Sequence, residues 1–456
     1  MRTGWASPSL VIERNRSRKW ELPQCTETRS GGPRWPRERP ARPVLSGRRC
    51  IHSLRSQSGA AVRIVLDRGV ASGLQRGGKA VQRPSPGTPP LPGFPGRTPL
   101  DTKSHDFLIS LLETPSPSGY EWPVQDLVRD YLAPIADSVA SDSHGNVIGT
   151  SNPGAPLRML LAGHCDQIGL IIQYIDGEGY LSVQPIGGWD PMQLIGSRVV
   201  VWGTGGPVPG VIARKPIHLL SDEERKVVPK IKDLWIDIGA PDRADAESVV
   251  RIGDCVTVEL RVQPLRRNLV ASPAMDDKVG LWVVLEAFRR AIAAGPLSCA
   301  LHVASTVQEE IGLRGAQTSA YGVNPHVAIA VDVTHATDCP TIDKKSEGDI
   351  SLGKGPVVFR GPNMNPHVVE RLLAAASANS IPCQLSASGR ATPTDANVLQ
   401  TTRAGVATAL VSVPNRYMHS GVETVSLDDL DHAADLLAAF IRGLEPNIDW
   451  APRRVR

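Results

Sequence analysis

Two adjacent glutamates, Glu309 and Glu310, follow the apolar run ALHVASTV at residues 300–307. Successive side chains leave an extended backbone on opposite sides, so two adjacent acids can do different work, one binding a cation and the other handling protons. A nearby dication would also remove the repulsion between the two carboxylates. A solvated loop is the alternative that the pair by itself leaves open.

Acids and histidines recur near the ends of other apolar runs. They are His164 and Asp166 in a His-x-Asp motif, Asp276-Asp277, Asp332 and His419. A His-x-Asp motif suits a metal-binding imidazole and a carboxylate that orients it, and an acid in so apolar a run as that of Asp332 is costly to bury unless it is paired or metal-bound. Helix capping for the aspartate pair and an ordinary loop position for His419 remain alternatives. Together the stretches supply two histidines and at least three carboxylates, a ligand set suited to two zinc, cobalt or manganese ions.

Strand-length and helix-length segments alternate from residue 99 and must position these side chains. Short apolar runs occupy 158–164, 169–175, 300–307, 326–333 and 407–414. Helical spacing occupies 104–114, 121–132, 278–294, 366–379 and 428–443. This alternation predicts an α/β fold, a three-layer sandwich with a mostly parallel, buried central sheet. Ligands collect at the strand ends of such sheets.

Residues 187–270 depart from this pattern. They contain Gly-Pro turns and strand-like runs such as VVVWG and VTVELRV, without a long helical period. We therefore expect an inserted β-rich domain, resembling a small barrel, at 187–270. The α/β domain is expected at 99–186 and 271–446, with a short tail at 447–456.

The first 98 residues differ in charge from the rest of the chain. They contain seventeen Arg and two Lys against four Glu and one Asp, whereas the whole chain carries a net charge of only +4. Their Pro-Gly clusters and missing periodicity predict a disordered leader. An organellar transit peptide, a nucleic-acid-binding arm and a start site placed too far upstream are the alternatives.

The seven cysteines, at positions 25, 50, 165, 255, 299, 339 and 383, form no CxxC pair. This usage predicts a reduced, intracellular protein of the cytoplasm, in which any metal is held by His, Asp and Glu. No apolar run approaches the roughly 18 residues of a membrane span.

Residues 104–443 resemble the glutamyl-type and TET aminopeptidases of the MH metallopeptidase clan, some of which have been labelled endoglucanases. The matching stretches are SPSGYE (116–121), GHCDQIGLII (163–172), GGW (187–189), AMDDKVGLWVVLEA (274–287), VQEEIGLRGA (307–316), VDVTHATDCP (331–340), LGKGPVV (352–358) and MHSGVE (418–423). The resemblance covers nearly the whole chain beyond the leader. It implies a zinc-aminopeptidase-like fold and the metal-dependent removal of N-terminal residues from peptides.

The resemblance also implies a role for each candidate residue. His164 and His419 would each bind one of two divalent ions, zinc or cobalt, with manganese as an alternative. Asp276 would bridge the ions with Asp277 as its support, Glu310 and Asp332 would complete the two ligand sets, Asp166 would hold His164, and Glu309 would be the general base.

Three departures from the family pattern concern substrate preference more than activity. Gln167 replaces an acid, Gly421 stands where Ser-Pro is expected, and the loop 389–397 keeps only the Thr394-Asp395-Ala396 end of a glycine-rich motif. The insertion resembles the family's dimerisation domain and implies a homo-oligomer built from dimers, up to a dodecamer, with a smaller assembly as the alternative. His218 would lie where that domain reaches an active site, or have a structural role.

Two other functions stay open from the sequence. A related dinuclear amidohydrolase, a deacylase or carboxypeptidase, would use the same ligands on the other end of its substrate. A non-catalytic protein would use the basic leader on nucleic acid, although the complete ligand set argues against this. A glycosidase would need two carboxyls facing each other across about 5–9 Å, whereas this cluster has the composition of a metal site.

Overall fold

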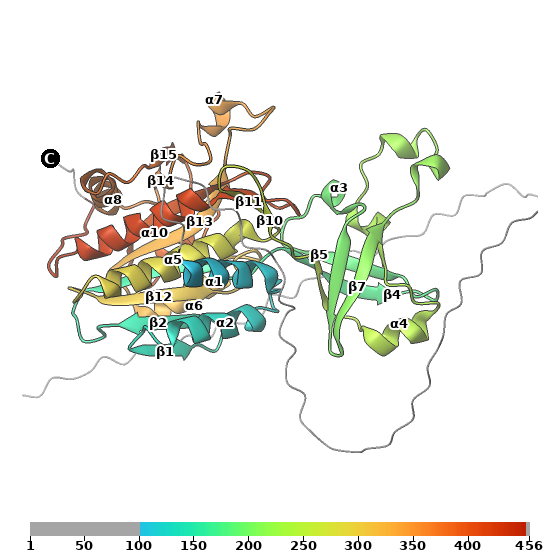
Figure 1. Cartoon of the computed structure of the whole chain (residues 1–456), viewed down its shortest axis with the longest axis horizontal. Coiled ribbons are helices and arrows are strands. Elements are labelled where there is room, and N and C mark those ends of the chain that lie inside the picture. Colours follow the sequence, from blue (N-terminus) through green and yellow to red (C-terminus); the bar gives the residue numbers. More distant parts are fainter. Residues whose placement is uncertain (1–100, 453–456) are drawn as a thin grey trace, which may run out of the picture. The chain divides into compact units, whose positions relative to one another are not determined.

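The structure is a computed structural model that describes residues 101–452 (Figure 1). The predictions for the leader, 1–98, and for the last four residues of the tail lie outside this range. Within the range, no helix has both the length and the apolar character needed to cross a bilayer.

A mixed sheet forms the centre of the α/β part. In the described range it has eight strands in the order β1-β2-β12-β3-β13-β16-β14-β15, and its four middle strands run parallel. The strands are β1 Ser138–Ser141, β2 Val147–Ser151, β3 Arg158–His164, β12 Ala300–Thr306, β13 Val327–His335, β14 Val357–Arg360, β15 Gln384–Ala387 and β16 Ala407–Asn415. All nine residues of β16 are buried, as are the first seven of β13, so both faces of the middle of the sheet are covered. The prediction of a mostly parallel, buried central sheet is confirmed.

The five stretches of predicted helical spacing all form helices, and the described residues contain five further helices that were not predicted, two of them within 187–270. The helices are α1 Thr102–Glu113, α2 Trp122–Leu132, α3 Pro191–Leu194, α4 Arg243–Val249, α5 Met275–Ala293, α6 Arg314–Val323, α7 Lys344–Glu347, α8 Pro366–Ala378, α9 Ala396–Leu399 and α10 Leu427–Arg442. Helices α5 and α10 lie side by side, and α5 also packs on β3 and β13 (Figure 1). Gly163 permits this approach, because a Cβ there would lie 2.9 Å from the Cα of Leu281. The start of α5 is thereby held against the end of β3.

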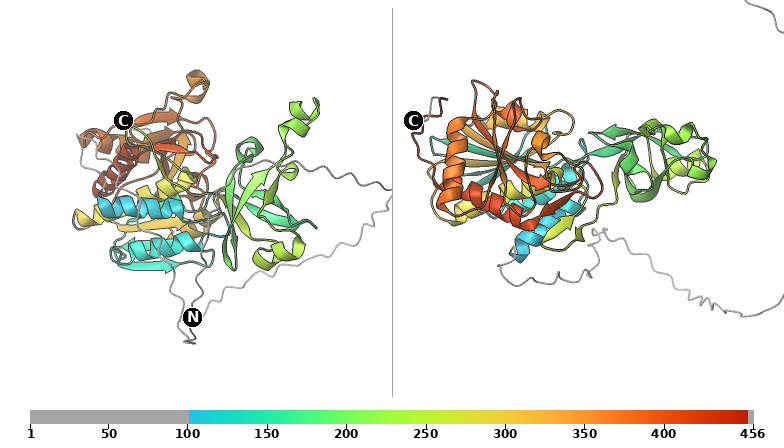
Figure 2. Two further views of the ribbon diagram at one scale, coloured as in Figure 1. Left: turned by 45° about the vertical axis from the view of Figure 1, so that its right-hand side comes forward. Right: turned by 90° about the horizontal axis from the view of Figure 1, so that it is seen from above.

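A closed barrel with its own apolar core is the second feature (Figure 2). Its strand order is β4-β5-β8-β7-β6-β9. The strands are β4 Gly169–Ile175, β5 Leu181–Ile186, β6 Arg198–Gly203, β7 Gly206–Ala213, β8 Trp235–Asp237 and β9 Cys255–Val258, and three 3-10 turns, 217–219, 224–226 and 231–233, lie between β7 and β8. The expected boundary at residue 187 therefore lies inside the barrel, since β4 and β5 precede it. Periodicity shows that a short run is a strand but not which sheet it joins.

A third, small sheet joins two distant segments of the chain. Strand β11, Leu269–Ala271, pairs antiparallel with β10, Gln263–Pro264, and with β17, Thr424–Ser426. Strand β11 leads into α5, and β17 follows the loop that contains His419. The small sheet therefore brings Asp276 and His419 to the same place.

Candidate active site

The candidate residues meet at the carboxyl ends of the parallel strands. His164 is the last residue of β3 and is paired in register with Thr306, the last residue of β12. Glu309 and Glu310 follow β12 after two residues, and Asp332 lies in the second half of β13. In parallel strands these ends share one edge of the sheet, so segments far apart in sequence converge there.

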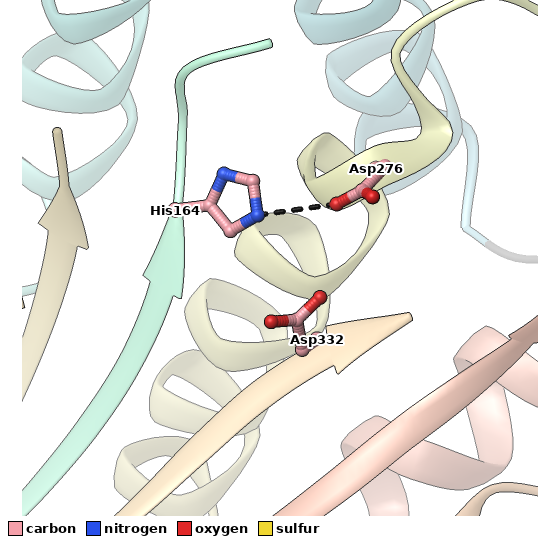
Figure 3. Close-up of side chains that lie close together, drawn as sticks. All are labelled: His164, Asp276 and Asp332. Carbon is pink, nitrogen blue, oxygen red and sulfur yellow. Dashed lines mark hydrogen bonds and ion pairs between the residues drawn. The ribbon is translucent and has the colours of Figure 1, made fainter. Parts of the chain in front are cut away.

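Two groups of side chains at this edge have the geometry of metal sites. His164, Asp276 and Asp332 form the first group, shown in Figure 3, and Asp276, Glu310 and His419 form the second. In each group the ligand atoms lie within 4.8 Å of one another. Asp276 belongs to both groups, because its Oδ1 lies 3.1 Å from Nε2 of His164 and its Oδ2 lies 3.3 Å from Nε2 of His419.

Main-chain carbonyls orient both imidazoles toward Asp276. Nδ1 of His164 is 3.0 Å from the carbonyl oxygen of Asp166, and Nδ1 of His419 is 2.8 Å from that of Gly188. Donation from Nδ1 leaves Nε2 as the free lone pair, which is the usual arrangement of a metal-binding histidine. Gly188 is suited to this contact, because a Cβ there would lie 3.2 Å from Nδ1 of His419.

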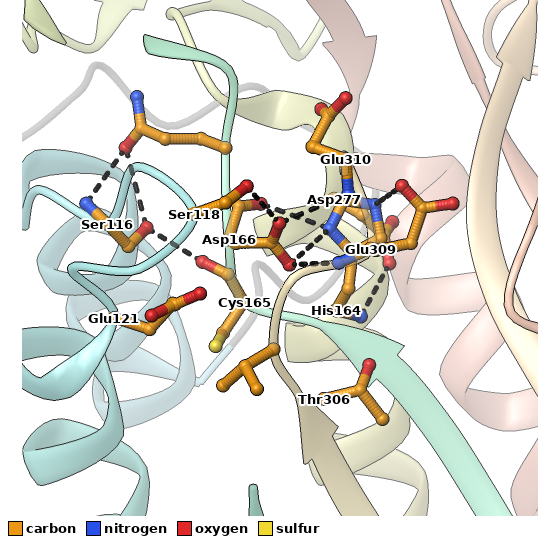
Figure 4. A network of polar contacts seen from close by, with 12 residues as sticks. Ser116, Ser118, Glu121, His164, Cys165, Asp166, Asp277, Thr306, Glu309 and Glu310 are labelled. Atoms are coloured by element: carbon orange, nitrogen blue, oxygen red, sulfur yellow. Dashed lines mark hydrogen bonds and ion pairs between the residues drawn. The ribbon is translucent and has the colours of Figure 1, made fainter. Parts of the chain in front are cut away.

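Asp166 holds the turn that contains both glutamates (Figure 4). Its Oδ1 accepts the backbone N–H of Glu309 at 3.0 Å, and its Oδ2 accepts that of Glu310 at 3.2 Å and the hydroxyl of Ser118 at 2.7 Å. Its Oδ1 is also 3.5 Å from Nδ1 of His164. The carboxylate of Asp166 therefore positions the glutamate turn, whereas the ring of His164 is held by the main-chain carbonyl of Asp166.

The two glutamates face different partners. Oε2 of Glu310 lies 3.5 Å from Nε2 of His419, whereas Oε2 of Glu309 lies 3.8 Å from Nε2 of His164. Glu309 belongs to neither of the two groups formed by the described residues. The Glu309 carboxylate is thus beside the site without being among its candidate ligands.

The charges at this edge suit bound cations. Burial, followed by the charge of Asp276, raises the pKa of Glu310 and of Asp332 well above the usual range. Burial also raises the pKa of Glu309 to about 10. Asp276 is the exception, since the two imidazoles outweigh its burial and lower its pKa. Among the described residues, Oε1 of Glu310 meets no hydrogen-bond partner. Buried carboxylates so arranged fit two divalent ions, which would supply the missing positive charge.

Other residues named from the sequence support the site or lie outside both groups. Asp277 is fully buried, and its carboxylate accepts the backbone N–H of His164 at 3.3 Å and that of Gly280 at 3.1 Å. Gln167 accepts a hydrogen bond at 2.7 Å from the buried ammonium of Lys278, in the place of the expected acid. His218 lies in the exposed turn Ile217–Leu219 of the barrel.

Two buried acids next to the site received no role in the sequence analysis. Glu423 accepts the backbone N–H groups of Asp276 and His419. Asp395 accepts the hydroxyl of Thr306 at 2.6 Å, and burial raises its pKa to about 6. Glu423 belongs to the matching stretch MHSGVE, and Asp395 belongs to the Thr-Asp-Ala end that the loop 389–397 keeps of the family motif. In the sequence, each of these two residues is an acid within a family motif, and this was the sign that it could have a role at the site.

Residues 145–436 match the M42 glutamyl aminopeptidase family. The chain belongs to this family. The expected family membership is therefore confirmed, and this M42 protein is a hydrolase of the aminopeptidase type.

Relatives of this M42 protein agree along most of its length. Lysyl aminopeptidase of Pyrococcus furiosus is 38% identical over 76% of this chain and 99% of its own length. The crystal structure of a TET aminopeptidase from a marine sediment archaeon, Thaumarchaeota archaeon SCGC AB-539-E09, is 36% identical, with a TM-score of 0.72 over 75% of this chain and 97% of its own. The Pyrococcus horikoshii TET1 peptidase, described as assembling into a tetrahedron or a large octahedral shell, is 32% identical, with a TM-score of 0.67 over 75% of this chain and 100% of its own.

Proposed function

We propose that the protein is a metal-dependent aminopeptidase that uses two divalent ions, zinc or cobalt, with manganese as an alternative. The observation that carries the proposal is the position of Asp276, whose two carboxylate oxygens each face the Nε2 of a different histidine. His164 and Asp332 complete one ligand set, and His419 and Glu310 complete the other. Zinc, cobalt and manganese all accept such mixed nitrogen and oxygen ligands.

We propose Glu309 as the general base. Two bound ions would lower the pKa of a water and polarise the scissile carbonyl. Glu309 would accept the water proton and deliver it to the leaving amine, because its carboxylate lies beside the ligands and is not used by them. Asp166 would keep Glu309 in place through the backbone N–H that it accepts at 3.0 Å.

Exposed apolar side chains on the barrel support a proposal for the assembly of the protein. The turns between β7 and β8 expose Ile217, Leu219, Val227 and Val228, each by 63% or more. Apolar exposure of this kind marks interaction surfaces, so we propose that the barrel forms a homodimer from which a larger shell is built. We also propose the three-layer, zinc-aminopeptidase-like arrangement of the α/β part and a cytoplasmic location.

Hydrolysis of a panel of aminoacyl-p-nitroanilides tests the proposal. The purified full chain is measured after chelation and after addition of cobalt or zinc, with the N-acetylated compounds in parallel. We expect cleavage only of the free-amine substrates and only with metal. No cleavage of any compound by a protein that binds two ions would favour the dinuclear deacylase, and no cleavage by a protein that binds no metal would refute the site.

A further inference from the structure

We infer that Glu423 is a positioning residue that builds the second ion site, the one formed by Asp276, Glu310 and His419. The inference rests on the two-metal site proposed above. It adds a residue that acts on this site through the backbone of two candidate ligands and does not itself bind an ion. Its basis is the geometry of one buried carboxylate between two segments of the chain.

Both oxygens of Glu423 are used by main-chain donors. Oε1 accepts the backbone N–H of His419 at 2.7 Å, and Oε2 accepts that of Asp276 at 2.9 Å. The side chain is 1% exposed. A carboxylate whose two oxygens are both occupied and turned away from solvent is placed to orient its neighbours rather than to bind an ion or a substrate amine.

The two donors belong to segments that are otherwise distant. Glu423 and Asp276 are 147 positions apart in sequence. The main chain reinforces the contact, since the carbonyl of Glu423 accepts the N–H of Ser272 at 2.9 Å. Glu423 therefore sets the separation between the bridging carboxylate and the second histidine.

The position of His419 depends on its contact with Glu423 more than the position of His164 depends on any one of its contacts. His419 lies in a loop with a left-handed backbone (φ +59°), and its ring is held by the carbonyl of Gly188. His164 ends a strand in the middle of the sheet, and its backbone N–H is also bound by Asp277. Loss of the Glu423 contacts should therefore weaken the second ion site more than the first, because the second uses both Asp276 and His419 whereas the first uses only Asp276 of the two.

Glu423→Gln removes one of the two contacts with little change in shape. An amide offers one acceptor oxygen, and its NH2 group would face the other backbone N–H as a second donor. Substitution of a residue that orients a metal ligand typically lowers metal affinity by about 10- to 100-fold. We expect this loss for the second ion and a smaller loss for the first, which shares only Asp276 with it.

Asp429 provides a matched control. It is also a buried carboxylate that accepts two backbone N–H groups, from Gly353 and Gly355, both at 2.7 Å. Neither glycine adjoins a proposed ligand. Asp429→Asn therefore makes the same chemical change without touching the ion sites, and we expect it to bind two ions as the wild type does.

The experiment is titration of the metal-free full chain with Co²⁺ by calorimetry, with the bound metal counted by elemental analysis. Thermal unfolding of the metal-free variants verifies that they fold. If Glu423→Gln does not fold, Glu423→Asp replaces it, because the shorter carboxylate cannot reach both donors and should lose the second ion in the same way.

The outcomes separate this inference from the proposed function. A second ion weakened at least tenfold, with the first ion weakened less, would support the role of Glu423. Two ions at wild-type affinity, or an equal loss of affinity for both ions, would overturn it and leave the proposed function intact. A wild-type protein that binds fewer than two ions would overturn the proposed function as well.

Discussion

Replacement of Glu309 by Gln isolates proton transfer from metal binding. The carboxylate of Glu309 lies outside both candidate ligand groups, and its backbone N–H is held by Asp166 independently of the side chain. The amide has the same shape but cannot accept the water proton at neutral pH. We therefore expect Glu309→Gln to bind two ions and to lose nearly all turnover.

The size of this loss follows from the surroundings of Glu309. A positioned general base typically contributes about 10²- to 10⁴-fold in rate. The side chain is only 10% exposed, so little bulk water is available to replace it as a proton acceptor. We expect the upper half of the range, a fall in kcat of about 10³-fold or more, which corresponds to about 4 kcal/mol of barrier.

The assay compares kcat, KM and metal content for Glu309→Gln and Glu310→Gln on the preferred aminoacyl-p-nitroanilide. Glu310 is the matched control, because the same substitution one residue later removes a candidate ligand that lies 3.5 Å from Nε2 of His419. Glu310→Gln should lose metal from the second site. A Glu309→Gln protein that keeps two ions and more than a tenth of the wild-type kcat would refute the base assignment.

Further predictions concern the ligands, the pH dependence and the packing. Asp276→Ala should lose both ions, because Asp276 belongs to both ligand groups, and elemental analysis after dialysis measures this. Burial raises the pKa of Glu309 to about 10 and raises that of Asp332, so the folded metal-free protein retains protons that the unfolded chain releases above about pH 4. Its melting temperature should therefore fall from pH 5 to pH 9, whereas the metal-loaded protein should not show this fall; equal slopes would contradict the argument. Gly163→Ala should cost about 1–3 kcal/mol in urea unfolding, because its Cβ would meet the backbone of α5, whereas Gly154→Ala, at a position with open space, should be nearly neutral.

The order of secondary-structure elements could be read from the sequence because it depends on local spacing. The apolar run 158–164 coincides with β3, and the helical spacing at 428–443 coincides with α10 within one residue. Burial on one or both faces imposes a period of 2, 3.6 or a continuous apolar run on the residues themselves. The candidate ligands could be named for a related reason, since few other tasks explain acids and histidines at the ends of such runs.

The grouping of strands into sheets could not be read in the same way. Strands β4 and β5 look like further strands of the α/β part, yet they close the barrel with strands that begin at residue 198 or later. A strand's own residues determine that it is extended and partly buried, whereas its partner is chosen by contacts with distant segments. For this reason the insertion limit predicted at residue 187 lies inside the barrel and not at its first strand.

The sequence by itself determined the types and the order of the candidate ligands, and only the tertiary structure decided how they are aimed. The carbonyls of Asp166 and Gly188 turn both imidazoles so that Nε2 faces Asp276. Glu423 ties together two ligand segments that lie 147 positions apart. Such contacts join main-chain atoms, which every residue has, so no residue type or spacing reveals them. They exist only once the strands have brought the segments to one edge of the sheet.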